Sequence, residues 1–217
     1  IRPDIYRMAD RRSHKGKRSK MNKGQNSNHP PLGAIIKVGP IRKIADIRKI
    51  KLLLSANPRN LCLFVMGINT NLRASDLCRI TVDMVRDNDE LVLREKKTGK
   101  ERRVTMNKAV RKAVRDLLRS PALTSLTTDA SPLFMGRRGA LTTISVNALV
   151  KAWCRQIGLK GNFGSHTLRK TWGYHQRVTF GVGIPELMVC FNHSNQRQTL
   201  DYLCVQPEEI KKVYENQ

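Results

Sequence analysis

The C-terminal half of the chain contains the stretch Ser165-His166-Thr167-Leu168-Arg169. His166 and Arg169 are three positions apart, so on a helix they lie on one face. A helix that begins just before them also directs free backbone N–H groups toward the same place, which favours a bound phosphate there. The short pattern is common, and by itself it more often means a histidine and an arginine on an ordinary helix surface.

A second group of polar side chains follows further along the chain. It consists of Asn192-His193-Ser194 and of Tyr202, nine positions after His193. Residues 196–201 can form a helix that carries the tyrosine. A lone tyrosine beside an apolar segment more often packs into a core, so only the combination of the two groups points to chemistry.

The charge of the chain points to a polyanionic partner. The 217 residues include 41 Lys and Arg against 17 Asp and Glu, for a net charge of +24. Such a field attracts nucleic acid above all, and an anionic membrane surface is the weaker alternative. Aromatic residues make up only 5% of the chain, whereas single-strand and RNA binders usually need stacking surfaces, so double-stranded DNA fits best. A ribosomal protein would explain the charge equally well.

Other classes of protein find little support in the sequence. No run of about 18 apolar residues is present, and residues 1–10 lack the apolar centre of a signal peptide, so we expect no membrane partner. The chain has no HExxH motif, no Walker loop and no acidic cluster, and we therefore expect neither a metal nor a cofactor. Its scattered cysteines are predicted to be reduced core residues of a cytosolic protein. They are Cys62, Cys78, Cys154, Cys190 and Cys204.

The first part of the chain differs from the rest. Basic residues crowd before a polar, proline-containing stretch that ends near residue 33. Such a segment cannot bury a core, so residues 1–35 are predicted to form a basic flexible arm or linker, and residues 36–217 the folded domain. The arm is either a solvated tail or a DNA-contacting element. In the second case the expected contacts are Arg11, Arg12, Lys15 and Lys17.

Hydrophobic periodicity predicts a mainly helical domain with one small antiparallel β-sheet. Strands are expected at residues 91–93 and 104–106, on either side of a turn at Thr98-Gly99. Residues 67–71 are expected to break the helical pattern, and residues 121–139 to be rich in loops. The expected helices cover residues 41–54, 58–66, a segment from 74, 107–118, 145–157, 166–178, 185–191, 196–203 and 208–214.

Five elements, taken in their order along the chain, resemble the signature of the tyrosine recombinase, or phage integrase, family. Members carry an arginine in a TGLRxxEL segment, a lysine in a β-turn, an HxLR motif, and a GH pair followed by a tyrosine at the interval found here. The resemblance covers about residues 41–215 and implies the catalytic fold of that family. The matching residues are Thr70-Asn71-Leu72-Arg73-Ala74-Ser75-Asp76-Leu77, Lys97-Thr98-Gly99-Lys100, His166-Thr167-Leu168-Arg169, Asn192-His193 and Tyr202.

The resemblance implies a metal-independent enzyme that cuts and rejoins DNA strands. Tyr202 would attack the scissile phosphate and form a 3′-phosphotyrosyl link. Arg73 and Arg169 would hold the non-bridging oxygens, a task that suits the planar, permanently charged guanidinium group. His166 and His193 would donate or relay protons near the phosphate.

The basic residues of the expected hairpin receive separate roles from the resemblance. Lys97 would protonate the departing 5′ oxygen, with Lys96 as the competing candidate for this position. Lys100 and Arg102 are expected to hold the DNA backbone.

Some positions depart from the family pattern without removing a catalytic group. Asn71 and Asn192 stand where glycine is usual, and Asp76 stands where glutamate is common. At position 71 the turn can survive the change, because asparagine tolerates a left-handed backbone better than most residues.

The N-terminus departs further. Most relatives carry a separate helical core-binding domain before the catalytic one, and the residues before position 41 are too few and too polar for it. We expect either a truncated chain or a short subgroup, in which the basic stretch from Arg11 to Lys23 could partly replace that domain.

By the same resemblance, the expected partner is double-stranded DNA, bound as a homo-tetramer on two sites, with a monomer off DNA and accessory DNA-bending proteins as options. The segment 208–214 would dock on a neighbouring protomer or on its own domain. The expected setting is a mobile element or prophage and the cytoplasm of a bacterium, on nucleoid DNA. Two alternatives stay open: a catalytically silent DNA-binding protein on the same fold, and a type IB topoisomerase-like enzyme.

Overall fold

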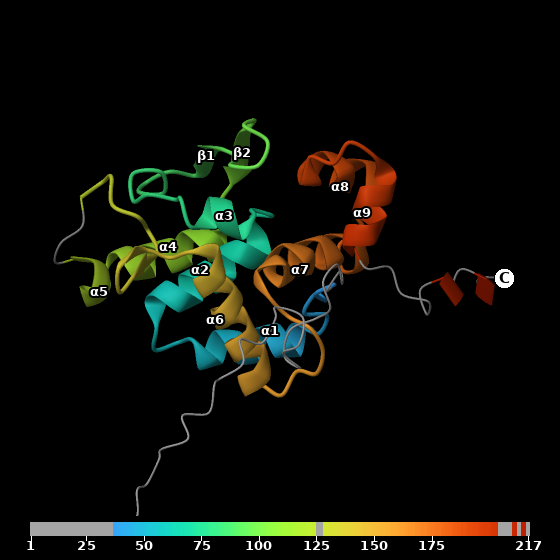
Figure 1. Cartoon of the computed structure of the whole chain (residues 1–217), viewed down its shortest axis with the longest axis horizontal. Helices are drawn as coiled ribbons and strands as arrows, with labels where there is room; N and C mark the ends of the chain where they lie inside the picture. The colour runs from blue at the N-terminus through green and yellow to red at the C-terminus, as the bar shows by residue number, and fades with distance from the viewer. Residues whose placement is uncertain (1–36, 125–127, 204–209, 212–213, 216–217) are drawn as a thin grey trace, which may run out of the picture. The chain divides into compact units, whose positions relative to one another are not determined.

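Helices dominate the computed structural model, which describes residues 37–124, 128–203, 210–211 and 214–215 (Figure 1). The helices are α1 (Ile44–Leu53), α2 (Pro58–Asn69), α3 (Ala74–Leu77), α4 (Lys108–Leu118), α5 (Pro121–Thr124), α6 (Thr143–Gln156), α7 (Ser165–Val178), α8 (Ile184–Phe191) and α9 (Gln196–Leu203). The strands are β1 (Glu90–Arg94), β2 (Glu101–Thr105), β3 (Met135–Gly136) and β4 (Gly139–Ala140). They pair antiparallel in two small sheets, β1 with β2 and β3 with β4. The expected fold class is confirmed, with a second small sheet in addition.

Helix α2 lies at the centre of the main core, where it packs against α4 and α7. Asn57 caps it by accepting a hydrogen bond from the backbone N–H of Asn60, and proline suits its first position. The predicted break at residues 67–71 is wrong at its start, because α2 continues to Asn69. Gly67 serves close packing instead: a Cβ at this position would lie 2.6 Å from Leu168 Cδ1 of α7.

A smaller buried cluster joins α7 to the two helices that follow it. Leu187, Phe191 and Leu203 form the cluster. Gly173 of α7 allows the close approach, because a Cβ there would lie 2.5 Å from Phe191 Cζ. Helix α7 therefore lies between α2 and the α8–α9 pair, as Figure 1 shows. This packing places α9 against the helix that begins with the His-x-x-Arg motif.

The β1–β2 hairpin contains both predicted strands. Its register pairs Glu90 with Thr105 and Arg94 with Glu101. Gly99 lies in the connecting turn with a φ of 69°, a left-handed conformation that glycine adopts without strain. The β3–β4 hairpin falls in the segment expected to be loop-rich, and its two-residue strands are too short to leave a periodic pattern.

The prediction that the cysteines belong to the core holds only in part. Cys62 and Cys154 are buried, and burial raises the pKa of the Cys154 thiol to about 12. Cys78 is half-buried, whereas Cys190 is exposed on α8, so the prediction is wrong for Cys190. Cys204, the whole of the predicted arm and most of the predicted helix 208–214 lie outside the described residues.

No helix within the described ranges combines the length and the apolar character that crossing a membrane requires.

Candidate active site

All six residues predicted to be catalytic line one open cavity of about 430 Å³. They come from the start of α3, the β1–β2 turn, α7, the α8–α9 connection and α9. The complete lining consists of Arg73, Lys97, Thr98, His166, Arg169, Asn192, His193, Gln198, Asp201 and Tyr202. The structure therefore brings together side chains that are far apart in the sequence.

The first turn of α7 carries His166 toward the tyrosine of α9. His166 Nδ1 lies 3.2 Å from the Tyr202 hydroxyl oxygen, so a neutral imidazole with a free Nδ1 can accept the phenol proton. Lys170 Nζ lies 5.3 Å from the centre of the Tyr202 ring, and Arg169 Cζ lies 5.9 Å from it. Two cationic side chains therefore lie beside the tyrosine ring.

Arg169 is held from both sides by backbone carbonyl groups. Its side chain is deeply buried, with 2% of the residue exposed. One guanidinium nitrogen donates to the Asn71 carbonyl, and another donates to the Phe191 carbonyl at 2.9 Å. Burial lowers the pKa of Arg169 to about 10, so the group stays charged at neutral pH. The two carbonyls fix the guanidinium at the cavity wall.

Both asparagines that replace the family's usual glycines adopt left-handed backbone conformations. Asn71 has a φ of 54° and Asn192 a φ of 55°. The expectation that asparagine preserves the turn at position 71 is confirmed. The Asn71 side-chain amide also donates to the Cys190 carbonyl at 2.8 Å, which joins the two turns that flank Arg169. Glycine could not make this link.

The two lysines of the hairpin turn differ in their position relative to the cavity. Lys97 lines the cavity, and it also lines a neighbouring cavity of about 520 Å³ that continues over the start of α6. Lys96 lines neither of them, and its backbone N–H donates to Asp76 Oδ1 at 2.9 Å. Asp76 therefore anchors the turn from α3, and the geometry favours Lys97 over Lys96 as the lysine near the reacting phosphate.

The two predicted DNA-backbone contacts of the hairpin differ in their surroundings. Lys100 is exposed, with its Nζ 3.4 Å from the Asn192 side-chain oxygen. Arg102 turns inward: it pairs with Glu95 Oε1 at 2.9 Å and donates to the Cys190 carbonyl at 2.9 Å. The geometry of Arg102 suits internal support of the site better than a DNA contact.

Sequence reasoning missed Glu95. Its buried carboxylate lies 2.8 Å from a guanidinium nitrogen of Arg73, which lines the cavity. A signal was present, because Glu95 continues the inward-facing alternation of Leu91 and Leu93 along β1. A glutamate at a buried strand position needs cationic or hydrogen-bonding partners.

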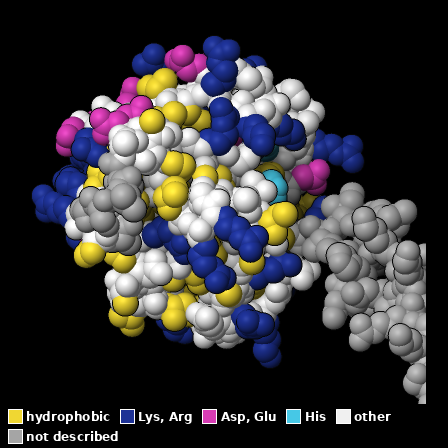
Figure 2. All heavy atoms as spheres, turned by 60° about the vertical axis from the view of Figure 1, so that its left-hand side comes forward, with side chains coloured by type: hydrophobic (Ala, Val, Ile, Leu, Met, Phe, Trp, Pro, Cys, Tyr) yellow, Lys and Arg dark blue, Asp and Glu magenta, His cyan; other side chains and the backbone are white. Residues whose placement is uncertain are grey.

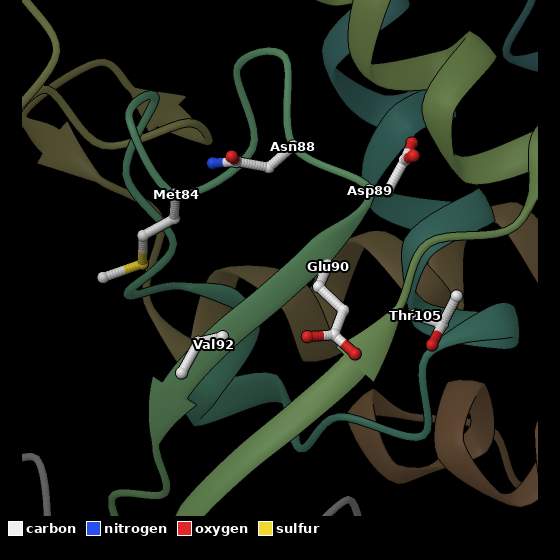
Figure 3. A pocket seen from close by; sticks show the side chains of 6 residues that line it. All are labelled: Met84, Asn88, Asp89, Glu90, Val92 and Thr105. Carbon is white, nitrogen blue, oxygen red and sulfur yellow. The ribbon is translucent and has the colours of Figure 1, made fainter.

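Charge is distributed unevenly over the molecular surface. Figure 2 shows Lys and Arg side chains spread across one face, with most of its acidic side chains near one edge. Figure 3 shows a separate cavity of about 670 Å³ beside β1 and β2, lined in part by Asp89 and Glu90. That cavity contains none of the predicted site residues, and its carboxylates would repel a phosphate.

Burial, reinforced by nearby cations, lowers the pKa of both site histidines. Burial, reinforced by Arg169, Arg73 and Lys97, lowers the pKa of His193 to about 4. Burial and neighbouring cations, Arg169 first among them, also lower the pKa of His166. The His193 ring stacks on Phe191 with ring centres 5.1 Å apart, and its Nδ1 lies 3.0 Å from the Thr199 hydroxyl.

This depressed pKa predicts a specific loss of stability in acid. Below about pH 6.5 the unfolded chain binds a proton at His193 that the folded chain rejects, so the free energy of unfolding falls as the pH drops from about 6.5 toward 4. We expect His193→Gln to flatten this dependence in chemical denaturation at a series of pH values, because glutamine does not titrate. Identical slopes for the two proteins would contradict the prediction.

Comparisons of this sequence with family models and with known proteins agree on one protein family. Residues 41–209 match the model described as Phage integrase family. The probable integrase/recombinase YoeC of Bacillus subtilis (strain 168) is 30% identical over 182 residues, which cover 82% of this chain and 95% of YoeC. The tyrosine recombinase XerC of Thermodesulfovibrio yellowstonii is 25% identical over 164 residues, which cover 72% of this chain and 54% of XerC.

Solved structures share the fold. The XerA recombinase matches with a TM-score of 0.67 at 18% identity, over 86% of this chain and 65% of that one. A lambda integrase dimer bound to a COC′ core site matches with a TM-score of 0.59 at 14% identity, over 78% of this chain and 49% of that one. The chain thus spans about half to two thirds of XerC, XerA and lambda integrase. Its match to the family model over residues 41–209, together with the 30% identity to YoeC, shows that the chain belongs to the phage integrase family of tyrosine recombinases.

Proposed function

We propose that the protein is a site-specific DNA recombinase, with residues 36–217 as its catalytic domain. The observation that carries the proposal is the convergence of Arg73, Lys97, Arg169 and both histidines on Tyr202 in one cavity. The 3.2 Å separation between His166 Nδ1 and the Tyr202 hydroxyl supports His166 as the proton acceptor and Tyr202 as the nucleophile. A catalytically silent DNA-binding protein would need none of these groups together.

The proposed cleavage step conserves the phosphodiester energy. The Tyr202 oxygen forms a bond to phosphorus, the bond from phosphorus to the 5′ oxygen breaks, and a 3′-phosphotyrosyl link results. The phenol proton passes to His166, and Lys97 gives a proton to the departing 5′ oxygen. Arg73 and Arg169 stabilise the charge that develops on the non-bridging oxygens, and His193 hydrogen-bonds near the phosphate. Attack by the 5′ hydroxyl of another strand reverses the step and joins that strand.

Covalent trapping tests this proposal. The protein is incubated with DNA that flanks its own gene, in nicked form, so that the short strand is lost after cleavage. We expect a protein–DNA adduct that resists denaturant. Tight binding without any adduct would support a silent DNA-binding protein instead. Relaxation of any supercoiled plasmid, without a special site, would support the topoisomerase-like alternative.

We further propose the partners and setting of this activity. The substrate is double-stranded DNA, cut within a homo-tetramer that assembles on two sites from monomers and that accessory DNA-bending proteins assist. The lambda integrase dimer on its core site supports DNA-dependent assembly in a relative. The proposed setting is nucleoid DNA in the bacterial cytoplasm, in the service of a mobile element or prophage.

The basic arm yields a separate prediction. If Arg11, Arg12, Lys15 and Lys17 bind phosphates, deleting residues 1–30 will weaken DNA binding and reduce the salt dependence of the affinity. Each lost phosphate contact removes about 0.9 from the slope of log affinity against log salt concentration. Filter binding or anisotropy at several salt concentrations measures this slope. An unchanged affinity and slope would leave the arm as a solvated tail.

A further inference from the structure

Glu95 has no part in the proposed cleavage step, although its carboxylate contacts Arg73 and Thr98, which line the cavity. The Glu95 side chain is 1% exposed. Glu95 directly follows β1, so it is the first residue of the turn that carries Lys97. The negative charge of a carboxylate buried beside a phosphate site opposes the binding of an anion. Its presence there therefore suggests a structural role that outweighs this repulsion.

The two carboxylate oxygens join separate parts of the site. Oε2 lies 2.8 Å from a guanidinium nitrogen of Arg73, and it also accepts a hydrogen bond from the Thr98 hydroxyl at 2.8 Å. Oε1 accepts from Arg102 at 2.9 Å. The Asn192 amide reaches Oε2 at 3.5 Å. One group therefore links α3, the hairpin and the loop before His193.

The backbone of Glu95 closes the same turn. Its N–H donates to the Lys100 carbonyl at 2.9 Å, and its carbonyl accepts from the Gly99 N–H at 2.9 Å. Within the turn that these bonds close, the Thr98 hydroxyl donates to the Glu95 carboxylate. Lys97 thus lies in a turn that Glu95 holds through both backbone and side chain.

The carboxylate stays charged in this setting. Burial alone would raise the pKa of Glu95, but hydrogen bonds from Thr98, Arg73 and Arg102 together lower it to about 2. A close ion pair with a fixed carboxylate restricts the orientation of the Arg73 guanidinium, which would otherwise sample many rotamers. Preorganised charge is what electrostatic stabilisation of a transition state requires.

We propose that Glu95 is a positioning residue, which holds the Arg73 guanidinium and the Lys97 turn in one arrangement around the scissile phosphate. The inference rests on the proposed function for its consequence in cleavage. Its structural part concerns the free protein and can be tested without DNA.

The free protein supplies the first test, by amide hydrogen exchange in the turn. We expect Glu95→Gln to accelerate exchange of the Gly99 amide by about three- to tenfold, since it weakens hydrogen bonds worth about 1 kcal/mol each. Thr98→Val removes the hydroxyl that donates to Glu95 and accepts from the Lys100 N–H, but it keeps the ion pairs of Glu95 with Arg73 and Arg102. It should therefore give a smaller acceleration, and it serves as a second variant should Glu95→Gln fail to fold. Glu101→Gln is the matched control, because Glu101 lies on the same hairpin with 57% of its side chain exposed. Equal exchange in Glu95→Gln and the wild type would overturn the proposal.

Cleavage supplies the second test. In a single-turnover reaction on a trapped substrate we expect Glu95→Gln to cut about 10²-fold more slowly, in the range seen when one preorganised donor is lost. Its DNA affinity should be unchanged or higher, because a negative charge has been removed, and Glu101→Gln should cut like the wild type. Wild-type cleavage by Glu95→Gln would overturn the proposal, and so would a defect in cutting that merely follows a defect in binding.

A substrate with a different leaving group separates the effect of Glu95 on Lys97 from its effect on Arg73. A substrate with sulfur in place of the bridging 5′ oxygen needs no proton for departure. The part of the defect that acts through Lys97 should therefore be recovered, while the part that acts through Arg73 should remain. If the wild type forms no adduct on any DNA, the proposed function fails, and the exchange experiment alone decides whether Glu95 positions these groups.

Discussion

Tyr202→Phe will abolish the covalent protein–DNA adduct while leaving DNA binding and the fold intact. The substitution removes only the hydroxyl oxygen that would bond to phosphorus. The ring keeps its neighbours, with its centre 5.0 Å from that of Phe191 and 5.6 Å from that of His193. We expect single-turnover cleavage to fall by at least about 10⁴-fold, as for the loss of other nucleophiles.

A second tyrosine near the C-terminus provides the control. Tyr214 is 80% exposed, so Tyr214→Phe should form the adduct at the wild-type rate. The adducts are separated on denaturing gels, and DNA affinity is measured in parallel. An adduct that persists in Tyr202→Phe and disappears in Tyr214→Phe would contradict the prediction and identify Tyr214 as the nucleophile.

Arg169→Lys will lower both cleavage and stability, although it preserves the charge. Lysine cannot donate to the carbonyls of Asn71 and Phe191 with the geometry of the guanidinium fork. A buried carbonyl that loses its donor costs about 1–3 kcal/mol in the free energy of unfolding. Cleavage should fall by about 10²–10³-fold, because a bidentate grip on the developing charge is lost.

Arg73→Lys is the informative comparison for Arg169→Lys, because it makes the same substitution at a more exposed arginine of the same cavity. Arg73 has 15% of its side chain accessible, and it forms an ion pair with Glu95. A lysine can keep an ion pair at that place, so we expect a similar loss of cleavage with a smaller loss of stability. Arg155→Lys is the control for the effect of replacing arginine by lysine as such, because Arg155 is exposed on α6 and does not line the cavity. Wild-type cleavage by Arg169→Lys would mean that positive charge alone suffices at this position.

Local patterns in the sequence predicted most of the fold, and the family resemblance proposed the site residues that the structure brings to one cavity. The i, i+3 spacing of His166 and Arg169 placed both on one face of a helix, and periodicity placed the helices near their observed bounds. The alternating strands and the Thr98-Gly99 turn identified the hairpin that carries Lys97. Each of these properties depends on residues close together in the chain.

Only the tertiary structure decided which of the charged side chains reach the cavity and which support it. Arg102 turns inward because the Cys190 carbonyl, 88 positions away, and the carboxylate of Glu95 accept its hydrogen bonds. Lys97 lines the cavity and Lys96 does not. The turn is held in this orientation because the Asp76 carboxylate of α3 accepts a hydrogen bond from the backbone N–H of Lys96. Composition and spacing determine which groups are available and which share an element. The partner of a long charged side chain depends on which distant segments fold beside it, since only there can a buried charge recover the hydrogen bonds that it loses on leaving water.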